Sequence, residues 1–236
     1  MEILRNIIEW DKQIFLMFNG CHNPFWDYVM AMLTTKEIWI PLYIAMIVVI
    51  ARRYGTKAVV IIALLILSIV LTDQIANVFK DMVHRLRPVH EPGLKGLVHY
   101  VMTKGGQFGF FSAHAANSFA LAFFTAKIFK RWHYTVFIFL WALLLCYTRI
   151  YVGAHYPLDV LAGIACGFLI GWLMYLLCKF IDKRFMATKR PMISEVSISN
   201  REILSLLLVF LTTYVIITIV VMNLLKFHMV ILQNAM

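Results

Sequence analysis

The chain has 236 residues, of which 62% are hydrophobic and 14% are charged, and its formal net charge is +10 at pH 7. Soluble domains are about half apolar and about a quarter charged, so this composition excludes a soluble protein and indicates an integral membrane protein. The basic residues stand mainly at the ends of apolar runs, which favours anionic lipids as partners and argues against nucleic acid.

The first 35 residues are predicted to form an amphipathic helical region in the membrane interface. Ile7, Ile14 and Phe18 belong to an apolar row at helical spacing, with Glu2 and Glu9 on the opposite side. This pattern is typical of a helix that lies along the membrane surface. The stretch has no basic segment followed by an unbroken apolar run, which argues against a signal peptide.

Six further segments are apolar and long enough to approach the roughly 20 residues that cross a bilayer. They are residues 36–52, 57–80, 112–129, 134–150, 157–180 and 203–225. The first is the weakest, because Lys36, Glu37 and Pro41 shorten it, and a helix begun near Phe25 is one way to lengthen it.

The predicted fold class is therefore all-α: a polytopic membrane helical bundle with about six transmembrane helices plus the N-terminal interfacial helix. We divide the chain into the interfacial region 1–35, a transmembrane core 36–180, and a polar linker with an additional C-terminal transmembrane helix at 181–236. Gly163, Gly167 and Gly171 form a GxxxGxxxG row that predicts close approach of a neighbouring helix. The longest loop, 88–111, contains five glycines, and loops of that length are commonly functional.

Polar residues gather in three clusters at the ends of spans. KDMVHRLRP (80–88) ends the second span, FSAHAAN (111–117) begins the third, and TRIYVGAHYPLD (148–159) joins the fourth to the fifth. Because successive spans alternate in direction, all three clusters are predicted to lie on one side of the membrane.

The first two clusters suit the binding of an anion. Lys80 and Arg87 are seven residues apart, which is about two helical turns, so both side chains can project from one face. A belt of basic side chains reaching the interface explains this pair alone equally well. Ser112 and His114 stand where a helix begins, and free N–H groups and the helix dipole favour anions there. An N-cap serine beside an unrelated histidine is the alternative.

The third cluster adds a histidine–carboxylate pair. Pro157 fits the first turn of a helix, so His155 precedes the helix and Asp159 lies near its third position. A carboxylate there can fix the tautomer of the imidazole and stabilise its charged form. A simple capping aspartate leaves Arg149, whose guanidinium suits phosphate, without a role. Three cations around two histidines predict a phosphoryl site, where one histidine attacks phosphorus and the other protonates the departing oxygen.

These residues resemble the motifs of the type 2 phosphatidic acid phosphatase superfamily, the membrane relatives of the vanadium haloperoxidases. The family motifs are K-x6-RP, PSGH and SR-x5-H-x3-D. The matching stretches in this chain are Lys80-x6-Arg87-Pro88, Phe111-Ser112-Ala113-His114 and Thr148-Arg149-x5-His155-x3-Asp159.

The resemblance implies that His155 is the nucleophile that forms a phosphohistidine, that Asp159 orients it, and that His114 protonates the leaving group. It further implies catalysis without a metal or a cofactor, and phosphate binding by Lys80, Arg87, Ser112, the backbone N–H of Ala113, and Arg149.

Three positions depart from the family pattern. Thr148 keeps the hydroxyl group of the family's serine, and Phe111 replaces a proline that has no catalytic group. Ala113 replaces a glycine, and its methyl group is expected to crowd the phosphate or to forbid a positive φ. These departures affect the expected shape of the pocket and the range of substrates.

The predicted function is an integral-membrane phosphatase that hydrolyses a phosphomonoester or diphosphate of an amphiphile. Undecaprenyl diphosphate, a lipid A phosphate, phosphatidylglycerol phosphate and phosphatidate remain open as substrates, and we expect the 88–111 loop to help select among them. The alternatives are a lipid phosphotransferase of the same fold and a non-catalytic phospholipid-binding or transport protein. The H-x3-D spacing argues against the last. Membrane lipids and the lipid substrate are the expected partners, with no obligate protein partner evident.

The expected location is a bacterial cytoplasmic membrane, with the active site facing the periplasm or exterior. The loops opposite the motifs are rich in lysine and arginine, which the positive-inside rule places in the cytoplasm. The motif side also carries basic residues, namely Lys80, Arg85, Arg87, Lys95 and Lys104, of which Lys80 and Arg87 already have a role in phosphate binding. Its N-terminal stretch holds five acidic residues against three basic ones: Glu2, Glu9, Asp11, Asp27 and Glu37 against Arg5, Lys12 and Lys36.

Overall fold

The computed structural model describes residues 2–102, 104–186 and 191–234, and these residues form α-helices, short 3-10 turns and loops without a β-strand. The predicted all-α class is confirmed. The helices of the described part are α1 (Glu2–Asn19), α2 (Pro24–Leu33), α3 (Ile40–Tyr54), α4 (Ala58–Val83), α5 (Ala113–Phe129), α6 (Trp132–Tyr151), α7 (Pro157–Phe185) and α8 (Asn200–Asn234).

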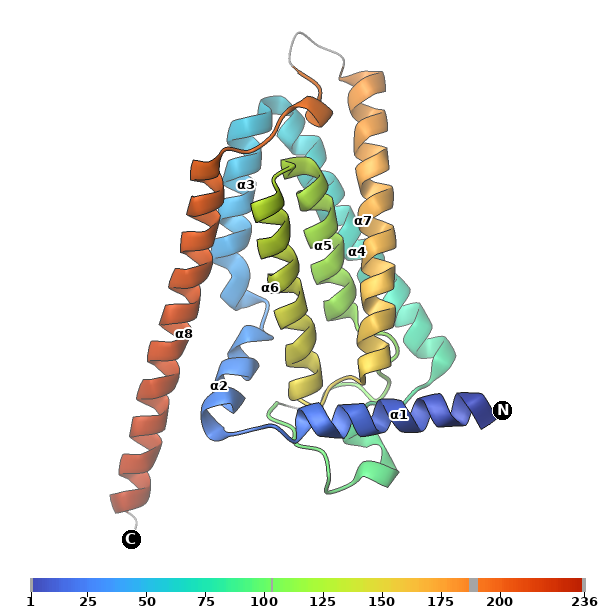
Figure 1. Cartoon of the computed structure of the whole chain (residues 1–236), viewed down its shortest axis with the longest axis vertical. Helices are drawn as coiled ribbons and strands as arrows, with labels where there is room; N and C mark the ends of the chain where they lie inside the picture. Colours follow the sequence, from blue (N-terminus) through green and yellow to red (C-terminus); the bar gives the residue numbers. More distant parts are fainter. Residues whose placement is uncertain (1, 103, 187–190, 235–236) are drawn as a thin grey trace.

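Helices α3 to α8 form the bundle, and α1 lies across one end of it (Figure 1). Four stretches of the described residues are long and apolar enough to cross a membrane: Glu37–Val83, Trp132–Tyr151, Pro157–Phe185 and Asn200–Phe227. The first of these contains both α3 and α4, which run antiparallel in Figure 1. The 17-residue helix α5 packs against α4, α6 and α7 in the middle of the bundle. A membrane bundle is confirmed, and the number of six crossings stays a prediction.

The segment before α3 interrupts the helix, whereas the sequence allowed one continuous helix from near Phe25 into the first span. Helix α2 ends at Leu33, and α3 begins only at Ile40, after a 3-10 turn. The indole N–H of Trp39 donates to the carbonyl oxygen of Leu33 at 2.8 Å and so bridges the break. Pro41 occupies the first turn of α3, where a missing N–H costs no hydrogen bond.

Helix α1 has an exposed face rich in apolar side chains and a buried face that holds both polar and apolar ones. Ile3, Ile7, Trp10, Ile14 and Met17 are exposed, as expected of a face turned to lipid. The inner face buries Asp11, Phe15 and Asn19, which are four residues apart. The buried amide of Asn19 donates to the carbonyl oxygens of His99 and Tyr151, both at 2.8 Å, and fixes the end of α1 to α6 and to the long loop.

The predicted glycine row is the contact between α7 and α5. A Cβ atom added at Gly163 would lie 2.4 Å from the carbonyl oxygen of Ser112, and one added at Gly167 would lie 2.4 Å from that of Ala116. Real Cβ atoms do not approach so closely, so these positions require glycine. The close approach sets the height of α7 relative to the start of α5.

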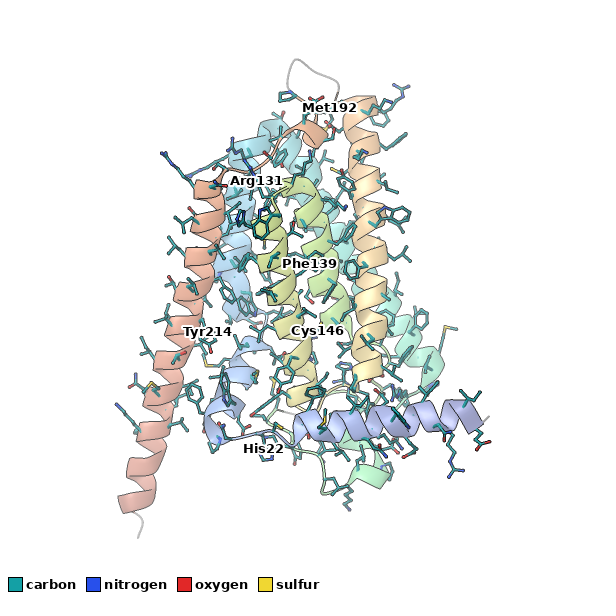
Figure 2. The ribbon with its side chains drawn as sticks, in the orientation of Figure 1. His22, Arg131, Phe139, Cys146, Met192 and Tyr214 are labelled. Carbon is teal, nitrogen blue, oxygen red and sulfur yellow. The ribbon has the colours of Figure 1, made fainter. Side chains whose placement is uncertain are left out.

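One end of the bundle collects the three polar clusters. Helices α4 and α6 end there, α5 and α7 begin there, and α1 covers it (Figure 1). We call it the motif end. Figure 2 places His22 at this end and Arg131 and Met192 at the opposite end, beside the turns that join α5 to α6 and α7 to α8. The three clusters therefore lie at the same end, as alternation of the spans predicts.

Candidate active site

The segment after α4 is held in place by the far end of the long loop. His84 ends α4 in a left-handed conformation with φ of 51°, and the chain then turns toward the loop. The backbone N–H of Arg87 donates to the carbonyl oxygen of Gln107 at 3.0 Å, and its Nε donates to that of Phe108 at 3.1 Å. A Cβ atom added at Gly109 would lie 3.0 Å from Arg87 Cγ, so this glycine makes room for the arginine side chain.

The start of α5 is joined directly to the third cluster. Ser112 is fully buried, and its backbone N–H donates to the carbonyl oxygen of Asp159 at 3.0 Å. Its hydroxyl oxygen accepts from the N–H of Ala115 at 3.4 Å, so Ser112 is the N-cap that sequence offered as an alternative. Ala113 is the first residue of α5 and has no positive φ, so its methyl group introduces no backbone strain here.

His155 and Asp159 are neighbours, but they are not hydrogen-bonded in this state. The distance from His155 Nδ1 to Asp159 Oδ2 is 3.7 Å, and the buried Nδ1 has no partner among the described residues. Asp159 Oδ2 accepts from the N–H of Tyr156 at 3.0 Å, so Asp159 also caps α7. Burial lowers the pKa of His155 to about 4, with Asp159 opposing this shift and Arg149 adding to it. The ring is therefore neutral at neutral pH, as a nucleophile must be.

A cavity of about 280 Å³ is lined by two of the three cationic residues of the motifs, and Lys80 is not part of its lining. Arg87, His114 and Arg149 line it together with Lys36 and Lys104, which the sequence analysis did not assign to the site. Arg149 is buried and donates to the hydroxyl of Thr34 at 2.5 Å, while its Nε has no partner among the described residues. Lys80, in the last turn of α4, lies within range of the charges of Arg87 and Arg149. Cations with unused donors suit a phosphate group.

An apolar cavity of about 130 Å³ adjoins the cationic one. The two cavities share Thr34, Thr35, Lys36 and His114. Away from His114, the apolar cavity is lined by side chains of the bundle interior, which include Trp39, Tyr43, Ile69, Leu121, Trp141 and Leu145. The site thus consists of a cationic cavity and an apolar cavity that meet at His114.

Two residues of the site, Arg85 and Asp11, were missed by the sequence analysis. Arg85 Nη1 donates to Asp159 Oδ1 at 2.7 Å, and Arg85 Nη2 donates to Asp11 Oδ2 at 2.6 Å. Arg85 is one of the six unspecified residues between Lys80 and Arg87 in the first motif, so the motif assigns it no role. Asp11 lies on α1, 74 residues away from Arg85, and no periodic pattern links the two.

The motif residues do not form a cluster of metal ligands. Among the described residues, one group of histidine and acidic side chains comes close enough to share an ion, namely His22, Asp27 and His99. None of these belongs to the three motifs. His99 Nε2 and Asp27 Oδ1 are 2.8 Å apart, which joins the long loop to α2.

The sequence matches a known protein family and named bacterial proteins. The PAP2 superfamily model matches residues 60–183. A lipid A 4'-phosphatase of Bacteroides thetaiotaomicron is 41% identical over 181 residues, which cover 75% of this chain and 80% of that protein. A lipid A 4'-phosphatase of Porphyromonas gingivalis is 32% identical over 191 residues, which cover 78% of this chain and 80% of that protein.

The fold has a counterpart among solved structures. The first transmembrane PAP2 type phosphatidylglycerolphosphate phosphatase from Bacillus subtilis superposes with a TM-score of 0.56 and 21% identity, covering 78% of this chain and 90% of that one. The chain belongs to the PAP2 superfamily. It is an integral-membrane lipid phosphate phosphatase of bacterial type, which confirms the predicted enzyme class.

Proposed function

We propose that the protein removes the 4'-phosphate of lipid A. Two relatives that align with three quarters or more of the chain carry that activity in their names. The observation in this structure that supports the proposal is the pair of adjoining cavities, one cationic and one apolar, that share His114. An amphiphile places its phosphate in the first and part of its hydrocarbon in the second.

The proposed reaction proceeds through His155. Because Nδ1 is directed toward Asp159, Nε2 is the atom left to attack phosphorus. As the N–P bond forms, the bond from phosphorus to the lipid oxygen breaks, and that oxygen takes a proton from His114. Water then attacks the phosphohistidine and breaks the N–P bond, while His114 recovers a proton from that water.

The remaining motif residues hold the phosphate in this proposal. Its oxygen atoms accept hydrogen bonds from a set of donors and cations consisting of Lys80, Arg87, Ser112, the backbone N–H of Ala113, and Arg149. Donors fixed in a buried site stabilise the charge of a transition state without reorganising. Charge on the phosphoryl oxygens is therefore balanced by side chains, and the reaction includes no metal-dependent step.

The substrate is tested with a panel of purified lipid phosphates. We expect wild-type protein to release free phosphate from bisphosphorylated lipid A faster than from undecaprenyl diphosphate, phosphatidylglycerol phosphate or phosphatidate, and equally well in chelator. Fragmentation mass spectrometry of the product should place the loss at the 4' position. Loss at the 1 position, or a faster reaction with another lipid, contradicts the substrate assignment. Transfer of phosphate to a second lipid, with no free phosphate, identifies a phosphotransferase.

We further propose that the motif end faces the periplasm. The turns at the opposite end carry Arg52, Arg53, Lys57, Lys130 and Arg131, and the positive-inside rule places such turns in the cytoplasm. The cationic cavity is lined at the motif end by the long loop and by the segment between α2 and α3, and in this proposal lipid of the outer leaflet enters from that end.

Thiol labelling in intact cells tests this orientation. In a background with the four native cysteines replaced, Lys95→Cys in the exposed long loop should react with a membrane-impermeant reagent. Thr56→Cys, exposed in the turn between α3 and α4, should react only after the cells are permeabilised. The reverse pattern would place the motif end in the cytoplasm.

A further inference from the structure

Helix α1 lies outside the residues matched by the family model, yet it reaches the centre of the site. Its Asp11 is 3% exposed and accepts two hydrogen bonds: Oδ2 from Arg85 Nη2 at 2.6 Å, and Oδ1 from the backbone N–H of Leu158 at 2.9 Å. Leu158 is in the first turn of α7, between His155 and Asp159. One carboxylate thus holds both the arginine and the helix start that carries Asp159.

Arg85 completes a chain of three charged groups. It bonds Asp11 with one amino group and Asp159 Oδ1 with the other, and its guanidinium lies 4.3 Å from the ring centre of Tyr156. Since the other oxygen of Asp159 accepts from Tyr156 N–H, both carboxylate oxygens are engaged and the group has no freedom to rotate. Asp159 is therefore aimed at His155 by contacts that begin on α1.

The net charge of Asp11, Arg85 and Asp159 has a consequence for His155. Arg85 and Asp159 alone form a neutral pair, which gives little support to a histidine that becomes positively charged when it attacks phosphorus. With Asp11 the three groups carry a formal charge of −1. That charge matters because the charges of Arg149 from α6 and Arg87 from the segment after α4 both disfavour a positive charge on the His155 ring.

We propose that Asp11 and Arg85 are positioning residues, which orient Asp159 and supply the net negative charge that stabilises the phosphorylated His155 ring. The proposal rests on the proposed histidine mechanism. Neither residue touches the substrate: their effect passes through Asp159. Loss of either one should slow the formation of phosphohistidine and leave substrate binding almost unchanged.

The test uses full-length protein in detergent with two substrates, bisphosphorylated lipid A and the soluble para-nitrophenyl phosphate. Asp11→Asn keeps the size of the side chain and removes its charge, and we expect kcat to fall at least about tenfold with KM within about twofold, the pattern of an interaction made only in the transition state. Single-turnover phosphorylation of His155 should slow by the same factor. Asp11→Glu should recover part of the rate.

Glu9→Gln is the matched control, because it makes the same change on the exposed side of the same helix. Its kcat should equal that of the wild type. Arg85→Lys keeps the charge but loses the planar fork whose two nitrogen atoms bond the two carboxylates separately, so it should reproduce the loss seen for Asp11→Asn. In the double variant the two losses should not add, since both residues act through one chain of contacts.

The outcomes separate this proposal from the proposed function. If Asp11→Asn matches Glu9→Gln in kcat, or if its loss is confined to KM, the positioning role is wrong while the phosphatase assignment stands. Losses that add in the double variant contradict a shared chain. If the wild type turns over para-nitrophenyl phosphate but not lipid A, the substrate assignment fails while the Asp11 test still proceeds. A wild type that reacts with neither substrate overturns both proposals.

Discussion

Replacement of His155 by alanine should abolish phosphoenzyme formation and lower kcat with lipid A by more than about 10⁴-fold, because it removes the covalent route and not just one proton transfer, which contributes about 10²–10⁴-fold. The measurement is radiolabelling with a ³²P-labelled substrate, quenched in alkaline detergent so that an N–P bond survives, followed by peptide mapping at alkaline pH. In the wild type the label should lie on His155 and be lost in acid, as expected of a phosphoramidate.

The control for this experiment is His133→Ala. His133 is an exposed histidine near the start of α6, at the opposite end of the bundle, so its removal should leave both label and turnover intact. Full turnover by His155→Ala, or label on His114 instead, would end the assignment of the nucleophile.

Replacement of His114 by alanine should produce a loss that depends on the leaving group. The sugar oxygen of lipid A is a poor leaving group without a proton, so kcat for that substrate should fall by about 10²–10⁴-fold. The para-nitrophenolate ion leaves without protonation, so formation of phosphohistidine from para-nitrophenyl phosphate should slow by less than about tenfold when the general acid is lost.

Single-turnover rates of phosphorylation with the two substrates give the comparison directly. They isolate the step in which the leaving group departs from the later attack by water, in which His114 takes part as a base. Equal slowing with both substrates would show that His114 binds phosphate or shapes the pocket and is not the general acid.

The sequence alone was sufficient to predict the helices of the bundle and the gathering of the three motifs at one end. Apolar length located every helix of the bundle, because each must be long and apolar to fill its place in a membrane. Most ends agree to within a few residues, but α7 and α8 continue to Phe185 and Asn234, beyond the predicted ends at 180 and 225. Counting their alternating directions then put all three clusters at one end. The spacing of the GxxxGxxxG row likewise predicted the α5–α7 contact, because glycine allows an approach that no other residue permits.

The remaining features depend on tertiary contacts that leave no local pattern. In the sequence Asp11 counted only as one of five acidic residues in the N-terminal stretch, and the docking of α1 buries it. Thr34 bonds Arg149 because the chain breaks between α2 and α3, which apolar length did not predict. Lys36 and Lys104 reach the cationic cavity from two segments whose fold could not be inferred from their composition.

The glycine row between α5 and α7 divides the site into a fixed wall and an adaptable one. Because the backbones of these helices are in direct contact, Ser112 and Asp159 are parts of one solid block, and a substrate cannot widen the gap between them. The second wall of the cationic cavity consists largely of residues 34–37 and of the glycine-bearing loop, and among the described residues no row of glycines fixes either segment to α5 or α7. Evolution can therefore alter which lipid enters by rebuilding that second wall while the reacting groups stay in register.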